Sequence, residues 1–182
     1  MSVLTPANQL TLTRVMLAPA FVILTVYGYF GWALVVFAVA GLTDLLDGLI
    51  ARKLGSRTSL GAWLDPMADK LLIVATVSVL TVPGLGLVNK LPVWLTILII
   101  SRDLLIVVTV AVINFAIGRR EFRPSIYGKI ATALYIVTGV VALYFNYLGR
   151  SAGLVQGLIY AALAITFISA GHYAWQVARM PH

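Results

Sequence analysis

Six apolar stretches dominate this 182-residue chain, and all but the first are long enough by themselves to cross a lipid bilayer as a helix. A helix rises 1.5 Å per residue, so about 20 apolar residues span the hydrocarbon layer of ~30 Å. Hydrophobic residues make up 61% of the sequence and charged residues only 10%, a balance that excludes an ordinary soluble domain. We therefore expect one all-α integral membrane domain over residues 1–182, built as a six-transmembrane-helix bundle.

Short polar, Pro- or Gly-containing connections separate the expected spans. The spans cover residues 15–26, 32–53, 60–82, 93–117, 125–147 and 154–177. Before them, Thr5-Pro6 is typical of a helix start, and the mildly amphipathic residues 8–14 predict a short N-terminal interfacial helix. Arg14, at the end of this segment, is expected to snorkel toward the membrane surface.

The basic residues gather at one end of the expected bundle. With six spans, both termini and the second and fourth connections share a side, which carries Arg14, Arg52, Lys53, Arg57, Lys70, Arg119, Arg120, Arg123, Lys129 and Arg179. Lys90 and Arg150 mark the opposite side. The positive-inside rule then predicts a multi-pass protein of a bacterial inner membrane with cytosolic termini. Because the cations form no runs and no amphipathic face, nucleic acid is not an expected partner.

Four of the six acidic residues fall within residues 44–69. A carboxylate at membrane depth costs roughly 2.5–3.5 kcal/mol, so it needs a compensating partner. On helices, Asp44 and Asp47 share a face, as do Asp65 and Asp69. Two such faces turned toward each other form an oxygen-rich cage, which divalent cations would keep ionised. We expect a metal-dependent site that opens to the cytosol.

The residues between the aspartates suit a phosphate-containing substrate. Gly48 and Gly61 carry no side chain and Ala51 has a small one, so a flat group can approach the backbone. Arg52 offers a bidentate fork to a phosphate. Two divalent ions can clamp a phosphoryl group during displacement. The chain has no cysteine, and no His or Ser stands at a specified position of the motif, which favours direct attack by an acceptor hydroxyl.

This motif is similar to the signature of the CDP-alcohol phosphotransferases, also called CDP-alcohol phosphatidyltransferases. The match runs Asp44-x2-Asp47-Gly48-x2-Ala51-Arg52-x8-Gly61-x3-Asp65-x3-Asp69. The resemblance implies a six-span bundle that moves a substituted phosphate from a CDP-linked donor to an alcohol and releases CMP. A transporter for ions or protons could also use intramembrane aspartates, but it would not require two glycines and an arginine at fixed offsets.

The resemblance also implies roles for the motif residues. Asp44, Asp47 and Asp65 would bind two divalent cations, Mg²⁺ or Mn²⁺, and Asp69 would complete this site and act as general base. The CDP pocket would be lined by Gly48, Ala51, Arg52 and Gly61.

The flanking residues are similar to the branch that makes phosphatidylglycerophosphate or cardiolipin from CDP-diacylglycerol. Ser101-Arg102-Asp103 resembles a stretch of mitochondrial-type cardiolipin synthases. Enzymes that use glycerol 3-phosphate more often place another arginine two turns later, where this chain is apolar near Val110. We therefore favour phosphatidylglycerol as acceptor and cardiolipin as product. The alternative is glycerol 3-phosphate, which would make the chain a phosphatidylglycerophosphate synthase.

Arg102 and Lys129 are the candidate acceptor-binding residues. Arg102 and Asp103 could instead form a structural charge network, and as neighbours on a helix they point in different directions and should need separate partners. A small-residue ridge at Gly153, Gly157 and Ala161 predicts close packing, either within the bundle or across a homodimer interface.

Overall fold

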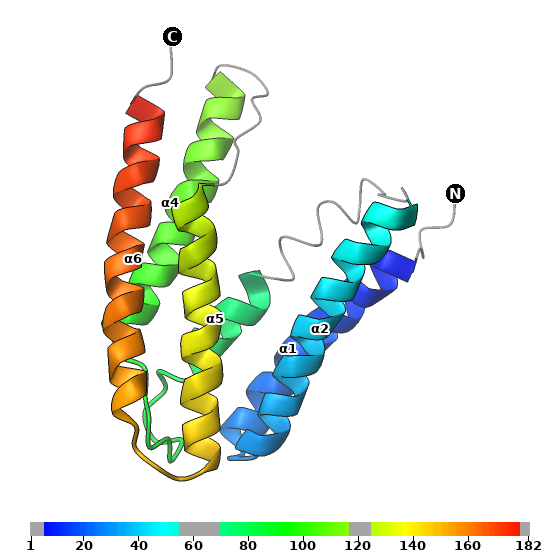
Figure 1. Ribbon diagram of the computed structural model, residues 1–182, viewed down its shortest axis with the longest axis vertical. Coiled ribbons are helices and arrows are strands. Elements are labelled where there is room, and N and C mark those ends of the chain that lie inside the picture. The colour runs from blue at the N-terminus through cyan, green and yellow to red at the C-terminus, as the bar shows by residue number, and fades with distance from the viewer. Residues whose placement is uncertain (1–5, 55–69, 117–124, 179–182) are drawn as a thin grey trace. The chain divides into compact units, whose positions relative to one another are not determined.

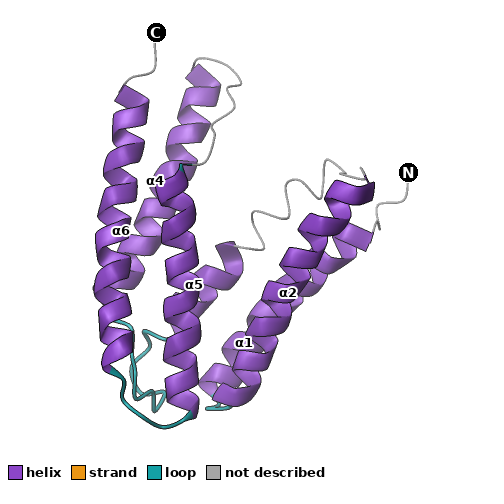
Figure 2. Ribbon diagram, in the orientation of Figure 1, coloured by secondary structure: helices purple, strands orange, loops and turns teal. Residues whose placement is uncertain are grey.

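The computed structural model describes residues 6–54, 70–116 and 125–178, and this part of the chain is helical, with turns and no strands (Figures 1 and 2). The helices are α1 (Pro6–Val26), α2 (Phe30–Leu54), a shorter helix Lys70–Val79, α4 (Val93–Ala116), α5 (Ile126–Tyr147) and α6 (Gly153–Ala178). The all-α class is confirmed, and the ends of α2, α4, α5 and α6 lie within two residues of the expected ones.

Among the residues that the structure describes, two helices are clearly long and apolar enough to cross a membrane. They are the 22 residues Ile126–Tyr147 of α5 and the 24 residues Gly153–Gln176 of α6. Both match expected spans, and they support a membrane protein.

The chain divides into two compact units. The first contains α1, α2, Lys70–Val79, the turns up to Lys90 and the second part of α5, from Gly139. The second contains α4, the first part of α5 and α6. Each unit has its own apolar core.

In the first unit, α1 and α2 run antiparallel and pack along their length (Figure 1). Phe21 of α1 meets Phe37 of α2 edge to face, with ring centroids 5.8 Å apart. Ala33 and Ala40 on α2 are fully buried, and their small side chains let the two backbones approach closely. The pair is therefore joined by packing as well as by its short turn.

The start of α1 differs from our expectation. A single continuous helix runs from Pro6 to Val26, with no break between an interfacial segment and a span. Nothing in the sequence interrupts it before Pro19, and the helix continues through that residue. Thr11 and Arg14 are both 1% exposed, whereas Leu12 between them is 45% exposed. The predictions that the N-terminal helix is separate from the first span and that Arg14 snorkels to the surface were wrong, and the interfacial position of residues 8–14 stays a prediction.

The second part of α5 is fixed to the rest of the first unit by close contacts. A Cβ placed at Gly139 would lie 2.8 Å from Thr76 Cγ2, so the glycine permits the helices to touch. Further along, Asn89 N donates to Asn146 Oδ1 at 2.7 Å, and Asn146 Nδ2 donates to Asn89 O at 3.0 Å. Asn89 Nδ2 also donates to the carbonyl of Arg150 at 2.8 Å. These bonds anchor the turn region around Asn89 to the end of α5.

In the second unit, α4 packs against α6. Leu95 and Ile99 of α4 are 2% exposed or less, and Val155, Ile159 and Ala162 of α6 are 3% exposed or less. Their spacing of three or four residues places each set on one face of its helix.

Changing Asn146 to Ala should lower the free energy of unfolding by about 1–3 kcal/mol, because it removes both buried hydrogen bonds between the Asn146 side chain and the Asn89 backbone. The measurement is reversible unfolding in mixed micelles. Thr109→Ala is the control, since the Thr109 hydroxyl is exposed and bonds to Leu105 O of its own helix. Equal losses in the two variants would contradict an anchoring role for the Asn89–Asn146 pair.

Candidate active site

The first half of the aspartate motif lies on one uninterrupted helix. Asp44, Asp47, Gly48, Ala51 and Arg52 all belong to the second half of α2, which continues to Leu54. The backbone therefore meets the helical spacing that the motif requires for the first aspartate pair.

The remaining motif residues, Gly61, Asp65 and Asp69, lie outside the described residues. The meeting of the two aspartate pairs, the metal site and the CDP pocket therefore stay predictions. The aspartate side chains fit the implied ions, because carboxylate oxygens are the ligands that Mg²⁺ and Mn²⁺ prefer.

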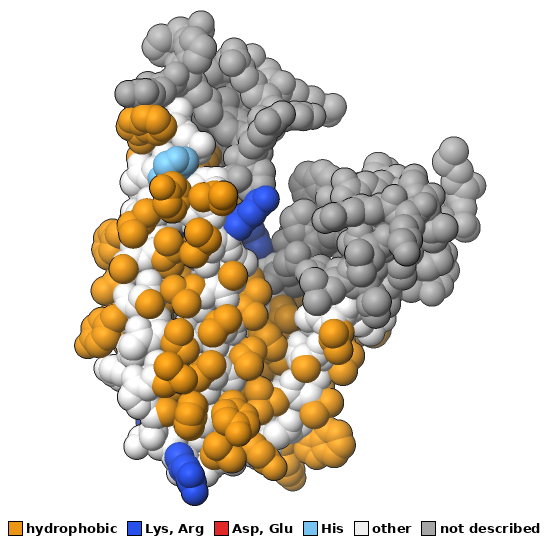
Figure 3. All heavy atoms as spheres, viewed as in Figure 1, with side chains coloured by type: hydrophobic (Ala, Val, Ile, Leu, Met, Phe, Trp, Pro, Cys, Tyr) orange, Lys and Arg blue, Asp and Glu red, His pale blue; other side chains and the backbone are white. Residues whose placement is uncertain are grey.

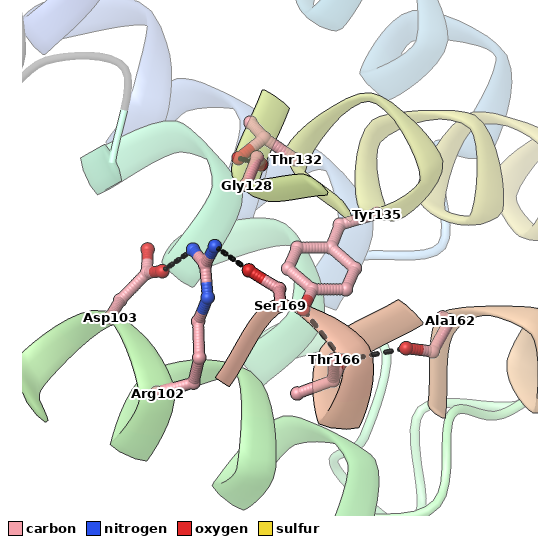
Figure 4. A network of polar contacts seen from close by, with 8 residues as sticks. All are labelled: Arg102, Asp103, Gly128, Thr132, Tyr135, Ala162, Thr166 and Ser169. Atoms are coloured by element: carbon pink, nitrogen blue, oxygen red, sulfur yellow. Dashed lines mark hydrogen bonds and ion pairs between the residues drawn. The ribbon is translucent and has the colours of Figure 1, made fainter. Parts of the chain in front are cut away.

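The second unit contains a buried arginine that links two helices (Figure 4). The Arg102 side chain on α4 is 10% exposed. Its Nη1 donates to Asp103 Oδ1 at 2.7 Å, and its Nη2 donates to Ser169 Oγ on α6 at 2.6 Å. Our expectation that Arg102 and Asp103 need separate partners was wrong, because the long guanidinium arm folds back onto the neighbouring carboxylate.

Arg102 also lies against the bare backbone of α5. A Cβ built at Gly128 would lie 3.0 Å from Arg102 Nη2 and 3.9 Å from Ser169 Oγ. The absence of a side chain at Gly128 thus makes room for the guanidinium. Lys129, the other candidate acceptor-binding residue, follows directly, and its side chain is exposed. The structure thus places the Arg102 guanidinium against Gly128, the residue of α5 that precedes Lys129.

One donor of Arg102 stays available. Within the part of the chain that the structure describes, the buried Nε has no hydrogen-bond partner. A buried polar group without a partner costs free energy, so it indicates a place for a further acceptor atom. Asp103 forms an ion pair with the guanidinium, and among the described residues Lys129 is an exposed cation next to Gly128 in the sequence.

A second polar chain lies next to this cluster (Figure 4). The hydroxyls of Tyr135 and Thr166 are 2.6 Å apart, and Thr166 Oγ1 donates to Ala162 O at 2.6 Å. Buried hydroxyls paired in this way hold α5 and α6 in register.

Sequence reasoning missed Ser169 and Gly128 as partners of Arg102. Ser169 lies 67 residues from Arg102, and no local pattern distinguishes it from other small residues of α6. Gly128 stands inside Tyr127-Gly128-Lys129, where the lysine alone drew attention. A glycine beside a candidate phosphate-binding residue was the available signal.

Comparison with known proteins identifies the family. Residues 4–168 match the CDP-alcohol phosphatidyltransferase family. A Mycobacterium tuberculosis H37Rv protein named "Probable phosphatidylglycerophosphate synthase" is 34% identical over 183 residues, which cover 95% of this chain and 81% of that protein. The human "Cardiolipin synthase (CMP-forming)" is 37% identical over 77% of this chain and 51% of its own length. A Streptomyces coelicolor protein of the same name is 36% identical over 71% of this chain and 60% of its own length.

The chain therefore belongs to the CDP-alcohol phosphatidyltransferase family and is a phosphatidyltransferase. The family resemblance predicted from the aspartate motif is confirmed. The alternative of an ion or proton transporter is set aside.

The Arg102–Ser169 bond predicts energetic coupling between α4 and α6. In a double-mutant cycle with Arg102→Gln and Ser169→Ala, we expect a coupling free energy of about 0.6–1.7 kcal/mol, the range of hydrogen bonds between membrane helices. Unfolding in mixed micelles measures it. A control cycle combines Arg102→Gln with Gly171→Ala on the same helix. A Cβ at Gly171 would meet nothing within 4 Å, so no coupling is expected there. Coupling no larger than in the control cycle would remove Ser169 as a partner of Arg102.

Proposed function

We propose that this chain transfers the phosphatidyl group of CDP-diacylglycerol to the free glycerol hydroxyl of phosphatidylglycerol and so makes cardiolipin. The acceptor oxygen forms a bond to the diacylglycerol-linked phosphorus. The bond from that phosphorus to the CMP phosphate oxygen breaks, and CMP leaves. The observation that carries the proposal is the aspartate motif, placed in part on α2 and found in a chain of the matching family.

The motif residues supply the reaction chemistry. Asp44, Asp47, Asp65 and Asp69 would hold two divalent cations, Mg²⁺ or Mn²⁺, which would stabilise charge on the phosphates. Asp69 would also remove the proton from the acceptor hydroxyl. The cytidine and phosphates of the donor would lie against Gly48, Ala51, Arg52 and Gly61.

The charge balance of the Arg102 cluster and the neighbouring Lys129 supports a lipid acceptor. Arg102 is paired with Asp103, so the cluster adds little net charge, and Lys129 contributes one exposed cation. A phosphodiester carries a single negative charge and suits this balance better than glycerol 3-phosphate, a dianion. Beyond Asp103, α4 continues to Ala116 without another basic residue. Arg102 Nε and Lys129 would therefore bind the acceptor phosphodiester.

Phosphatidylglycerophosphate synthesis is the second candidate. The mycobacterial relative with that name matches over 95% of this chain, a longer stretch than the human and Streptomyces cardiolipin synthases match. The two candidates share donor, metals and leaving group, and they differ only in the acceptor.

We further propose that the chain forms a single six-span domain over residues 1–182. The spans would be α1, α2, the expected span 60–82, α4, α5 and α6. The termini and the aspartates would lie at the cytosolic face of a bacterial inner membrane.

A homodimer is supported by the small-residue ridge of α6. Gly153, Gly157 and Ala161 are exposed, and a Cβ at either glycine would meet nothing within 4 Å among the described residues. Packing of this ridge within the described part of the chain is thus not observed.

Replacing Asp44, Asp47 or Asp65 singly with Asn should reduce CMP release about 10²-fold or more, because each change removes a metal-binding charge. The helical circular dichroism spectrum and the elution volume in detergent should be unchanged. Near-normal turnover in any one variant would remove that residue from the metal site.

The acceptor is tested by incubating the purified protein with CDP-diacylglycerol, Mg²⁺ and either phosphatidylglycerol or glycerol 3-phosphate. We expect CMP release with phosphatidylglycerol. Arg102→Gln and Lys129→Gln should raise KM for the acceptor more than KM for the donor. Release with glycerol 3-phosphate alone would assign the second candidate function, and release with neither acceptor would contradict both.

A further inference from the structure

An aromatic groove lies in the first unit, at the end of α2 opposite its aspartates. Its volume is about 620 Å³, and its walls come from the start of α2 and from the last turns of α5. The rings that line it include Tyr29, Trp32, Tyr144 and Tyr147. Trp32 is 65% exposed and Tyr147 is 60% exposed, so the groove is open along one side.

Two helix caps hold the groove walls in place. At the end of α1, Gly28 has a φ of 78°, Gly28 N donates to Thr25 O, and Tyr29 N donates to Leu24 O. At the end of α5, Gly149 has a φ of 63°, Gly149 N donates to Asn146 O, and Arg150 N donates to Phe145 O. This is the glycine-terminated Schellman arrangement, which fixes the direction of the residue after the glycine. That residue is Tyr29 in the groove wall and Arg150 beside it.

A second cation is held close to Arg150. The side-chain amide of Asn89 donates to the carbonyl of Arg150 at 2.8 Å, so Lys90 is one residue from that contact. Lys90 and Arg150 are both exposed. The sequence has no acidic residue from 70 to 102 or from 122 to 182. Figure 3 shows a basic side chain beside hydrophobic ones where α5 ends.

We propose that this face binds an anionic phospholipid of the adjacent leaflet, with an acyl chain in the aromatic groove and the headgroup phosphate on Lys90 and Arg150. Tyr and Trp favour the headgroup level of a membrane, and each cation near an anionic lipid surface contributes about a fivefold gain in affinity. A soluble anion would leave the apolar groove unused. A second copy of the chain would bring two more cations against these two. A phospholipid matches both the apolar groove, through an acyl chain, and the two cations, through its phosphate.

This lipid site is separate from the active site of the proposed function. Trp32 lies twelve residues before Asp44 on the same helix, which corresponds to about 18 Å. A lipid in the groove can therefore be detected from Trp32 without interference from donor or acceptor at the aspartates.

The test uses the full-length protein in vesicles, with Trp63, Trp94 and Trp175 changed to Phe so that Trp32 alone fluoresces. Brominated phosphatidylglycerol should quench Trp32 with a relative affinity at least about fivefold above that of brominated phosphatidylcholine. The double variant Lys90→Gln, Arg150→Gln should bring this ratio close to one, whereas Lys90→Arg with Arg150→Lys should preserve it.

A groove variant tests the apolar half of the site. A Cβ at Gly31 would lie 2.9 Å from the Tyr147 ring, so Gly31→Ala should displace that ring and weaken quenching of Trp32 by phosphatidylglycerol. Gly41→Ala, on the same helix with nothing within 4 Å of its Cβ, is the matched control. Equal quenching by the two lipids, or a preference that survives loss of both cations, would overturn the proposal. So would protection of Trp32 from both lipids, which would assign the groove to a protein contact.

Discussion

The cost of placing carboxylates in a membrane protein is the constraint on which the proposed chemistry depends. Four aspartates lie within residues 44–69, in a chain with only two other acidic residues. At membrane depth such a cluster stays ionised only beside positive charge. The cations of the chain are few and mostly outside the apolar segments, so bound divalent ions are the compensation that we propose. The same ions would organise the phosphates of the donor, and this links the folding requirement to the chemistry.

The positive charge of Arg102, within an apolar helix, also needs a compensating partner. The partly buried guanidinium is compensated by Asp103 on its own helix and by Ser169 on α6, and the missing side chain at Gly128 on α5 makes room for it. The cluster thus ties α4 to α6 and lies against α5, and Arg102 Nε has no hydrogen-bond partner among the described residues. Structural stabilisation and acceptor binding are compatible here, because Nη1 and Nη2 each bond within the protein while Nε does not.

Much of the fold could be predicted from the sequence because apolar length and helix-breaking residues act locally. The ends of α4, α5 and α6 follow from Pro92, Ser125 and the Gly149–Gly153 turn. The contacts of polar residues could not be predicted in this way. Arg14 was expected at the surface and is buried, and Arg102 found a partner 67 residues away. Such contacts depend on tertiary packing, which a periodic pattern does not encode. The aspartate motif itself was readable because its spacing is fixed by helix geometry, although its second half lies outside the described residues.

The most direct test of the account is the number of divalent ions that the protein binds. Calorimetric titration of the purified protein with Mn²⁺, in the presence of CDP-diacylglycerol, should give two ions per chain. The Asp44→Asn, Asp47→Asn double variant should lose both binding events while keeping its helical content, because each ion needs charge from α2. Two ions bound with unchanged affinity in that variant would contradict the assignment of these aspartates and, with it, the proposed mechanism.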